Sequence, residues 1–140
     1  MVLLSKNQSG ATPINKRPTR QIDYSKLSLS KIISDVDSGQ ITSLISVGRG
    51  YFATASNVGT IKIWEPQKQS PIAIITEDEG IDFMVPYMQK NDIKIVYVCR
   101  SVLKCFSVKN MRAYLLLEND HPITSITQNQ QQPTVISFGL

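Results

Sequence analysis

The chain has 140 residues, 41% of them hydrophobic and 19% charged, which is ordinary for one globular domain with its own core. No run approaches the roughly 20 apolar residues of a membrane-spanning helix, and the opening Val2-Leu3-Leu4 is too short for a signal peptide. Composition therefore predicts a protein without a membrane span, cytoplasmic by default and with a nuclear location left open.

The N-terminal stretch 1–26 is polar and lacks hydrophobic periodicity, a composition typical of disorder. Residues 1–34 hold six Lys or Arg and one acid, a net charge of +5, while the whole chain carries +4, so the remainder carries −1. We interpret this basic arm as a solvated tail. The less favoured alternative is a docking arm for nucleic acid through Lys16, Arg17 and Arg20, with binding that weakens steeply in salt.

The next predicted element is a strand at 27–34, where apolar and hydroxyl residues alternate. A hairpin follows, because residues on both sides of Asn57 and Gly59 are aromatic, small or β-branched and suit a pleated, partly buried surface. Asn and Gly both tolerate positive φ, so the chain should reverse between them. The whole unit spans 41–76, with predicted strands at 41–46, 51–56, 60–65 and 71–76.

The hairpin recurs at an offset of 42 residues. TIKIWE (60–65) aligns with VLKCFS (102–107), so that Phe106 corresponds to Trp64 and Lys104 to Lys62. Four-stranded β-propeller blades recur every 40–45 residues or thereabouts. The repeat therefore predicts a second unit at 81–118 and the start of a third at 123–140, with strands at 81–86, 93–99, 102–107, 113–118, 123–127 and 134–138.

The segments ITSL (41–44) and FATASNVGTIKIWE (52–65), with their weaker copies, resemble WD40 repeats. The resemblance covers roughly 27–140 and implies an all-β fold of propeller blades: two full four-stranded blades, a partial third and an N-terminal outer strand at 27–34, in an incomplete ring. It also implies a non-catalytic scaffold or adaptor that binds other proteins. Gly59, Trp64 and Phe106 take structural positions in these repeats.

The repeats depart from the family pattern. Glu65 follows Trp64 where the family prefers Asp, and no Gly-His pair precedes the first strand of either full unit. His121 lies closer to Ile123 than the family spacing. We therefore expect the family's buried Asp–His–Ser/Thr–Trp network to be incomplete in both units, and apolar packing to be the main force holding them together.

A closed propeller needs at least about four blades, more than this chain supplies. Truncation of a longer chain that contains the missing blades is the favoured interpretation. The alternative is a completing partner chain, because an open sheet edge presents unpaired backbone groups to a partner strand.

No set of side chains suggests catalysis or a cofactor. His121 is the only histidine and is flanked by Asp120 and Pro122 in a predicted loop, without a nucleophile beside it in sequence. Cys99 and Cys105 are expected to be buried free thiols, with a disulfide as the alternative. We therefore expect no enzyme, metal or cofactor, unless a catalytic part lies in sequence outside this chain.

Binding is expected where the family topology gathers the second-to-third-strand turns and the loops after fourth strands. This surface would be mostly acidic, which favours basic peptides as partners. Its predicted residues are Asp35, Asp37, Asn57, Glu77, Asp78, Glu79, Arg100, Asp120 and His121.

Overall fold

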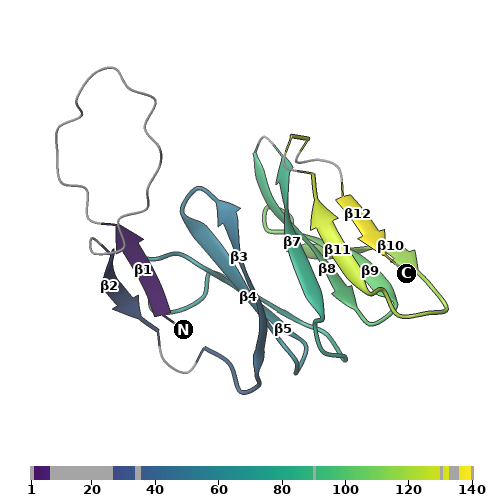
Figure 1. The fold of residues 1–140 in the computed structure, drawn as a ribbon, viewed down its shortest axis with the longest axis horizontal. Helices are drawn as coiled ribbons and strands as arrows, with labels where there is room; N and C mark the ends of the chain where they lie inside the picture. The colour runs from purple at the N-terminus through teal and green to yellow at the C-terminus, as the bar shows by residue number, and fades with distance from the viewer. Residues whose placement is uncertain are drawn as a thin grey trace. The chain divides into compact units, whose positions relative to one another are not determined.

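The computed structural model describes residues 2–6, 27–33, 36–89, 91–129, 131–132 and 136–139. These residues form twelve β-strands and no helix (Figure 1). They contain no helix long and apolar enough to cross a membrane. The chain divides into two compact units, Met1–Val36 and Asp37–Leu140.

The first unit contains one antiparallel hairpin, in which β1 (Val2–Lys6) pairs with β2 (Leu27–Ile32). The prediction of a disordered arm is wrong for Val2–Lys6, because this short apolar run finds a partner strand more than 20 residues away in sequence. Residues 7–26, including Lys16, Arg17 and Arg20, lie outside the described residues. The strand predicted at 27–34 is observed as β2, and it is paired with β1.

The second unit contains two four-stranded antiparallel meanders and a third, two-stranded sheet. The first sheet consists of β3 (Ile41–Gly48), β4 (Tyr51–Ser56), β5 (Thr60–Trp64) and β6 (Ala73–Thr76). The second sheet consists of β7 (Phe83–Gln89), β8 (Asp92–Cys99), β9 (Val102–Ser107) and β10 (Arg112–Glu118). The third sheet consists of β11 (Ser125–Gln128) and β12 (Ile136–Gly139).

The prediction of an all-β chain with four-stranded antiparallel sheets is confirmed, and its main errors lie at strand starts. The first strands of the second and third sheets begin two residues later than predicted. The cause is the same in both, because Ile81 donates its N–H to Ser56 O (3.0 Å) and Ile123 donates to Arg100 O (2.8 Å). These residues therefore join one sheet to the next. The described strands do not close a ring, and the blade assignment stays a prediction.

The sequence repeat is also a repeat of backbone hydrogen bonds. Glu77 N donates to Gly59 O (2.8 Å), and 42 residues later Asn119 N donates to Ser101 O (3.0 Å). Gly59 has φ of 85°, and a Cβ at this position would overlap the carbonyl oxygens of Glu77 and Glu79. Glycine is therefore required both by the left-handed turn and by the close approach of the following linker.

The core lies between successive sheets, and β7 lies next to both β3 and β11 (Figure 1). Apolar side chains of β4, β5 and β6 meet one face of the second sheet, including Ile95 and Tyr97 of β8. The opposite face of the second sheet packs with Ile123 and Ile126 of the third. Cys99 belongs to the first of these layers and Cys105 to the second, so the prediction of buried free thiols is confirmed.

Candidate interaction surface at the turn ends

One end of the second unit gathers the β4–β5 turn, the β8–β9 turn and the linkers that enter the first strands, and we call it the turn-end surface. Backbone and side-chain hydrogen bonds hold these segments together. Asn57 N donates to Gln40 O (3.0 Å), and Gln40 N donates to Asn57 Oδ1 (2.8 Å). Arg100 N donates to the carboxylate of Asp82 (2.7 Å) in the corresponding turn of the second sheet. Turns and linkers therefore form one hydrogen-bonded framework.

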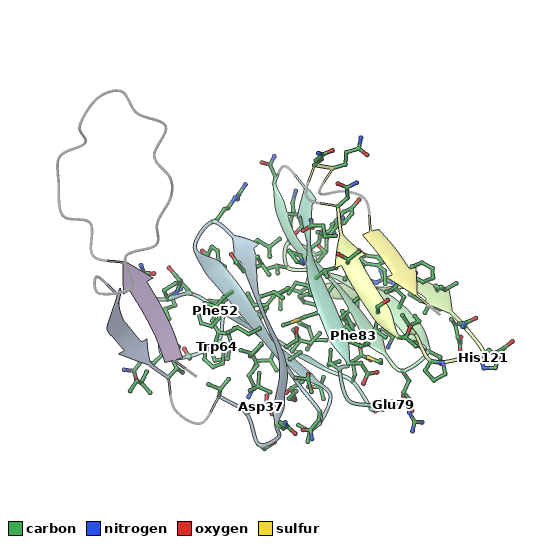
Figure 2. The ribbon with its side chains drawn as sticks, viewed as in Figure 1. Asp37, Phe52, Trp64, Glu79, Phe83 and His121 are labelled. Atoms are coloured by element: carbon green, nitrogen blue, oxygen red, sulfur yellow. The ribbon has the colours of Figure 1, made fainter. Side chains whose placement is uncertain are left out.

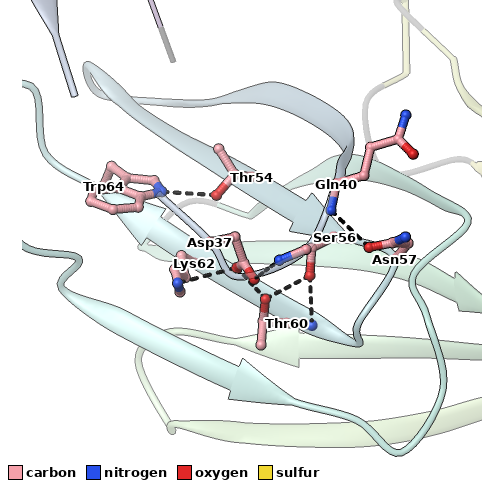
Figure 3. Close-up of polar contacts among 9 residues, drawn as sticks. Asp37, Gln40, Thr54, Ser56, Asn57, Thr60, Lys62 and Trp64 are labelled. Carbon is pink, nitrogen blue, oxygen red and sulfur yellow. Dashed lines mark hydrogen bonds and ion pairs between the residues drawn. The ribbon is translucent and has the colours of Figure 1, made fainter. Parts of the chain in front are cut away.

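Asp37 belongs to this end but points inward, with only 3% of its side chain exposed. Its Oδ2 lies 3.1 Å from Lys62 Nζ and also accepts a hydrogen bond from Thr60 Oγ1 (Figure 3). Burial alone would raise the pKa of the Asp37 carboxyl, but hydrogen bonds from Thr60, Lys62 and Gly39 outweigh burial and hold the pKa below its usual value. Asp37 is therefore a structural anion.

Glu77 repeats this arrangement in the second sheet. Its Oε2 lies 2.5 Å from Lys104 Nζ, and its Oε1 accepts a hydrogen bond from the Tyr97 hydroxyl at 2.5 Å. Burial, followed by the hydrogen bond to Glu77, raises the pKa of Tyr97 far above its usual range, so Tyr97 stays a donor. We call Asp37–Lys62 and Glu77–Lys104 the two anchor pairs.

Neither anchor pair was recognised from sequence, although the alignment already placed Lys104 under Lys62. The acids lie 40 residues apart and the lysines 42, and no local pattern marks their contact. Asp37 and Glu77 were predicted to lie on an exposed partner-binding surface, but in the structure each is largely buried against a lysine of a third strand.

Six of the predicted surface residues are exposed. Glu79 and Arg100 form a solvent-exposed ion pair with 3.4 Å between Oε1 and Nη1. Asn119 Nδ2 donates to the backbone O of His121 and shapes the last linker. Figure 2 shows Glu79 and His121 along the same margin as Asp37. Asp35 lies outside the described residues, and the exposed set is Asn57, Asp78, Glu79, Arg100, Asp120 and His121.

The first sheet also contains a buried hydrogen bond between the side chains of Trp64 and Thr54, which was not predicted from the sequence. Trp64 Nε1 donates to Thr54 Oγ1 at 2.9 Å (Figure 3). The Trp64 ring also stacks on Phe52, with the ring centroids 6.2 Å apart. Ser56 and Thr60 exchange a hydroxyl hydrogen bond of 2.7 Å. No histidine takes part in these contacts, and the core of this sheet is formed by apolar side chains, as expected. Phe106, at the Trp64 position of the second sheet, has no polar side-chain atom to repeat the bond.

The described residues include two cysteines and several acidic side chains that were considered as metal ligands. Among them, no group of three or more His, Cys, Asp or Glu side chains is placed to hold a metal ion. Burial raises the pKa of Cys99 to about 12 and also raises the pKa of Cys105, so both remain protonated thiols near neutral pH.

No protein-family model matches this chain, and comparison with curated proteins finds no match.

Proposed function

We propose that this chain is part of a WD40-type propeller scaffold whose turn-end surface binds other proteins. The observation that carries this proposal is the repetition of the anchor pairs. In each four-stranded sheet, a lysine in the middle of the third strand binds an acid from the linker that enters that sheet. The linkers are thereby held in the same way from sheet to sheet, which suits a rigid display of exposed loops.

The exposed charges left on this surface favour a basic partner. Lys62 and Lys104 compensate Asp37 and Glu77, while Asp78, Glu79 and Asp120 remain exposed beside the cation Arg100. Exposed charges of this kind steer association and select partners more than they add affinity. A basic, extended peptide is therefore the proposed ligand class.

Fluorescence anisotropy with short Lys/Arg-rich peptides, and with acidic peptides of equal length, tests the proposal. The variant D78N/E79Q should weaken binding of the basic peptide by roughly 3- to 10-fold, since exposed charge pairs contribute about 0.2–1 kcal/mol each. Binding should also weaken as salt is added.

The matched control is Q67K/Q69K, which changes the net charge by the same amount at the opposite ends of the strands, in the exposed β5–β6 connection. Its affinity should stay close to that of the unmodified chain. If both variants lost the same affinity for the basic peptide, the effect would come from net charge alone and not from the turn-end surface. If no basic peptide bound to the unmodified chain, the proposed ligand class would be wrong.

A further inference from the structure

The end of the second unit opposite the turn-end surface carries the opposite charge. It is formed by the β3–β4, β5–β6 and β9–β10 connections, and we call it the basic end. Among the described residues of these connections and the first residue of β10, the exposed ionisable side chains are all cations: Arg49, Lys68, Lys109 and Arg112. The one acid in these connections, Glu65, is less exposed, and its Oε2 lies 2.7 Å from Lys68 Nζ.

Hydrogen bonds hold the tip of the β9–β10 hairpin in place at this end. The carboxylate of Asp92, at the start of β8, accepts a hydrogen bond from Ser107 Oγ (2.6 Å) and another from Lys109 N (2.9 Å). Met111 N donates to Val108 O (3.3 Å) and closes the turn. The tip is therefore preformed by contacts within the second sheet.

Met111 is an unusual residue for its place in this tip. Its φ is 49°, in the left-handed region that Gly and Asn adopt readily and that other side chains adopt only at a cost. Met111 is also 58% exposed, so packing offsets little of that cost. A residue that suits neither the local backbone nor the core points to a role outside the fold itself.

Cations flank Met111 on both sides. Lys109 precedes it by two residues and Arg112 follows it directly, and both are exposed. The guanidinium carbon of Arg112 lies 5.6 Å from the centroid of the Tyr114 ring, a cation–π contact that orients the side chain beside the tip. The hairpin therefore presents an apolar tip between two positive charges.

This combination suits an anionic lipid surface better than a protein ligand. Small ligands and peptide side chains are usually held in concave apolar sites, whereas Met111 lies at the tip of a hairpin, beyond the ends of its strands. An anionic bilayer has negative headgroups at its surface and hydrocarbon beneath them, so it can accept cations and an apolar side chain together.

We propose that the basic end docks on an anionic membrane surface, with Met111 inserted among the lipid headgroups and Lys109 and Arg112 against their negative charges. Arg49 and Lys68, from the first sheet, add to the attraction at the same end. The inference goes beyond the proposed function and uses none of the residues of the turn-end surface.

Sedimentation of the full chain with lipid vesicles tests the charge requirement. The chain should bind vesicles of equal parts phosphatidylserine and phosphatidylcholine, and it should not bind phosphatidylcholine alone. The variant K109Q/R112Q should bind the mixed vesicles roughly 10-fold or more weakly, since each cation near an anionic surface contributes about 5-fold. Added salt should weaken binding as well.

The variant M111G tests the insertion and separates it from folding. Glycine accepts the left-handed conformation, so the urea midpoint of M111G should equal or exceed that of the unmodified chain. Its affinity for the mixed vesicles should nevertheless fall by roughly 3- to 10-fold, because the apolar side chain is lost. The matched control is V58G, which removes an apolar residue that is 47% exposed in the β4–β5 turn at the other end and should bind vesicles normally.

A fluorescent probe reports the insertion directly. Cys99 and Cys105 are buried, so an environment-sensitive dye should react with the new thiol of M111C. Its emission should shift to the blue when mixed vesicles are added. The same dye on Q69C, an exposed polar position at the basic end, should show little shift.

The N-terminal stretch 1–34 carries a net charge of +5 and should also attract anionic vesicles. All of these variants leave that stretch unchanged, so its contribution is the same in each. Repeating the comparison in the K16Q/R17Q/R20Q background should leave the affinity ratio between the chain with Met111 and M111G unchanged.

Three results would overturn the inference: no binding to the mixed vesicles, equal vesicle binding by M111G and V58G, or no blue shift at M111C. Binding of an acidic peptide without vesicle binding would assign the basic end to a protein partner instead. A chain that binds vesicles but no basic peptide would support the inference and overturn only the proposed ligand class of the turn-end surface.

Discussion

The ammonium group of Lys104 lies 2.5 Å from Glu77 Oε2 and joins the third strand of the second sheet to the linker that leaves the first. Lys62 and Asp37 make the equivalent contact one sheet earlier, at 3.1 Å. Because both acids are largely buried, these contacts should influence stability more than surface ion pairs do.

Removing Lys104 should therefore destabilise the fold. In K104M the Glu77 carboxylate keeps only the Tyr97 hydroxyl, and we expect the free energy of unfolding to fall by about 1–3 kcal/mol in urea titrations. The matched control is K68M, which breaks the more exposed Lys68–Glu65 pair and should leave the urea midpoint close to that of the unmodified chain. Equal losses in K104M and K68M would show that the anchor contributes no more than a surface pair.

The turn at Gly59 should tolerate no side chain. Gly59 and Gly50 have similar positive φ values, 85° and 79°, but only at Gly59 would a Cβ overlap neighbouring backbone. We expect G50A to cost about 1 kcal/mol of unfolding free energy through backbone strain alone. The added overlap in G59A should cost at least about 1 kcal/mol more. Similar melting temperatures for the two variants would contradict the close approach of the Glu77–Glu79 linker.

The buried hydrogen bond of Trp64 should appear as coupling energy between two side chains. W64F keeps an aromatic ring against Phe52 but removes the N–H that binds Thr54, and T54V removes the acceptor. Each single variant should lose about 1–2 kcal/mol, and the double variant should lose clearly less than the sum of the two. Strict additivity in chemical denaturation would show that the two groups do not interact.

Protonation of the Asp37 carboxylate at low pH should lower the free energy of unfolding. Its folded-state pKa is held below the unfolded value, so its contribution is complete above the unfolded pKa of about 3.9 and is lost as the pH falls through the folded pKa. The difference in urea midpoint between the unmodified chain and D37N should therefore shrink as the pH falls from about 4 to about 2. D78N, which removes one exposed acid, is the control for the change in net charge. If the difference in urea midpoint between D37N and the unmodified chain did not change with pH, the lowered pKa of Asp37 would be contradicted.

The sequence alone determined the strand pattern of the second unit. Two local signals located the two four-stranded meanders: the recurrence of TIKIWE as VLKCFS, and the turn residues Asn57 and Gly59. Both signals can be read locally, because the alternation of side chains along a strand and the residues of a tight turn do not depend on distant contacts. The exposed residues Asp78, Glu79, Asp120 and His121 were also predictable, since polar residues in linkers between strands usually face solvent.

Tertiary structure decided what depends on contacts distant in sequence. It paired Val2–Lys6 with Leu27–Ile32, and it turned Asp37 and Glu77 inward. Burial of each carboxylate is compensated by a lysine and by hydrogen-bond donors, and that lysine lies 25 or more residues away, on a strand whose position is set by packing. The local sequence pattern therefore identified the strands. Contacts with distant lysines determined that Asp37 and Glu77 are buried while the neighbouring acids remain exposed.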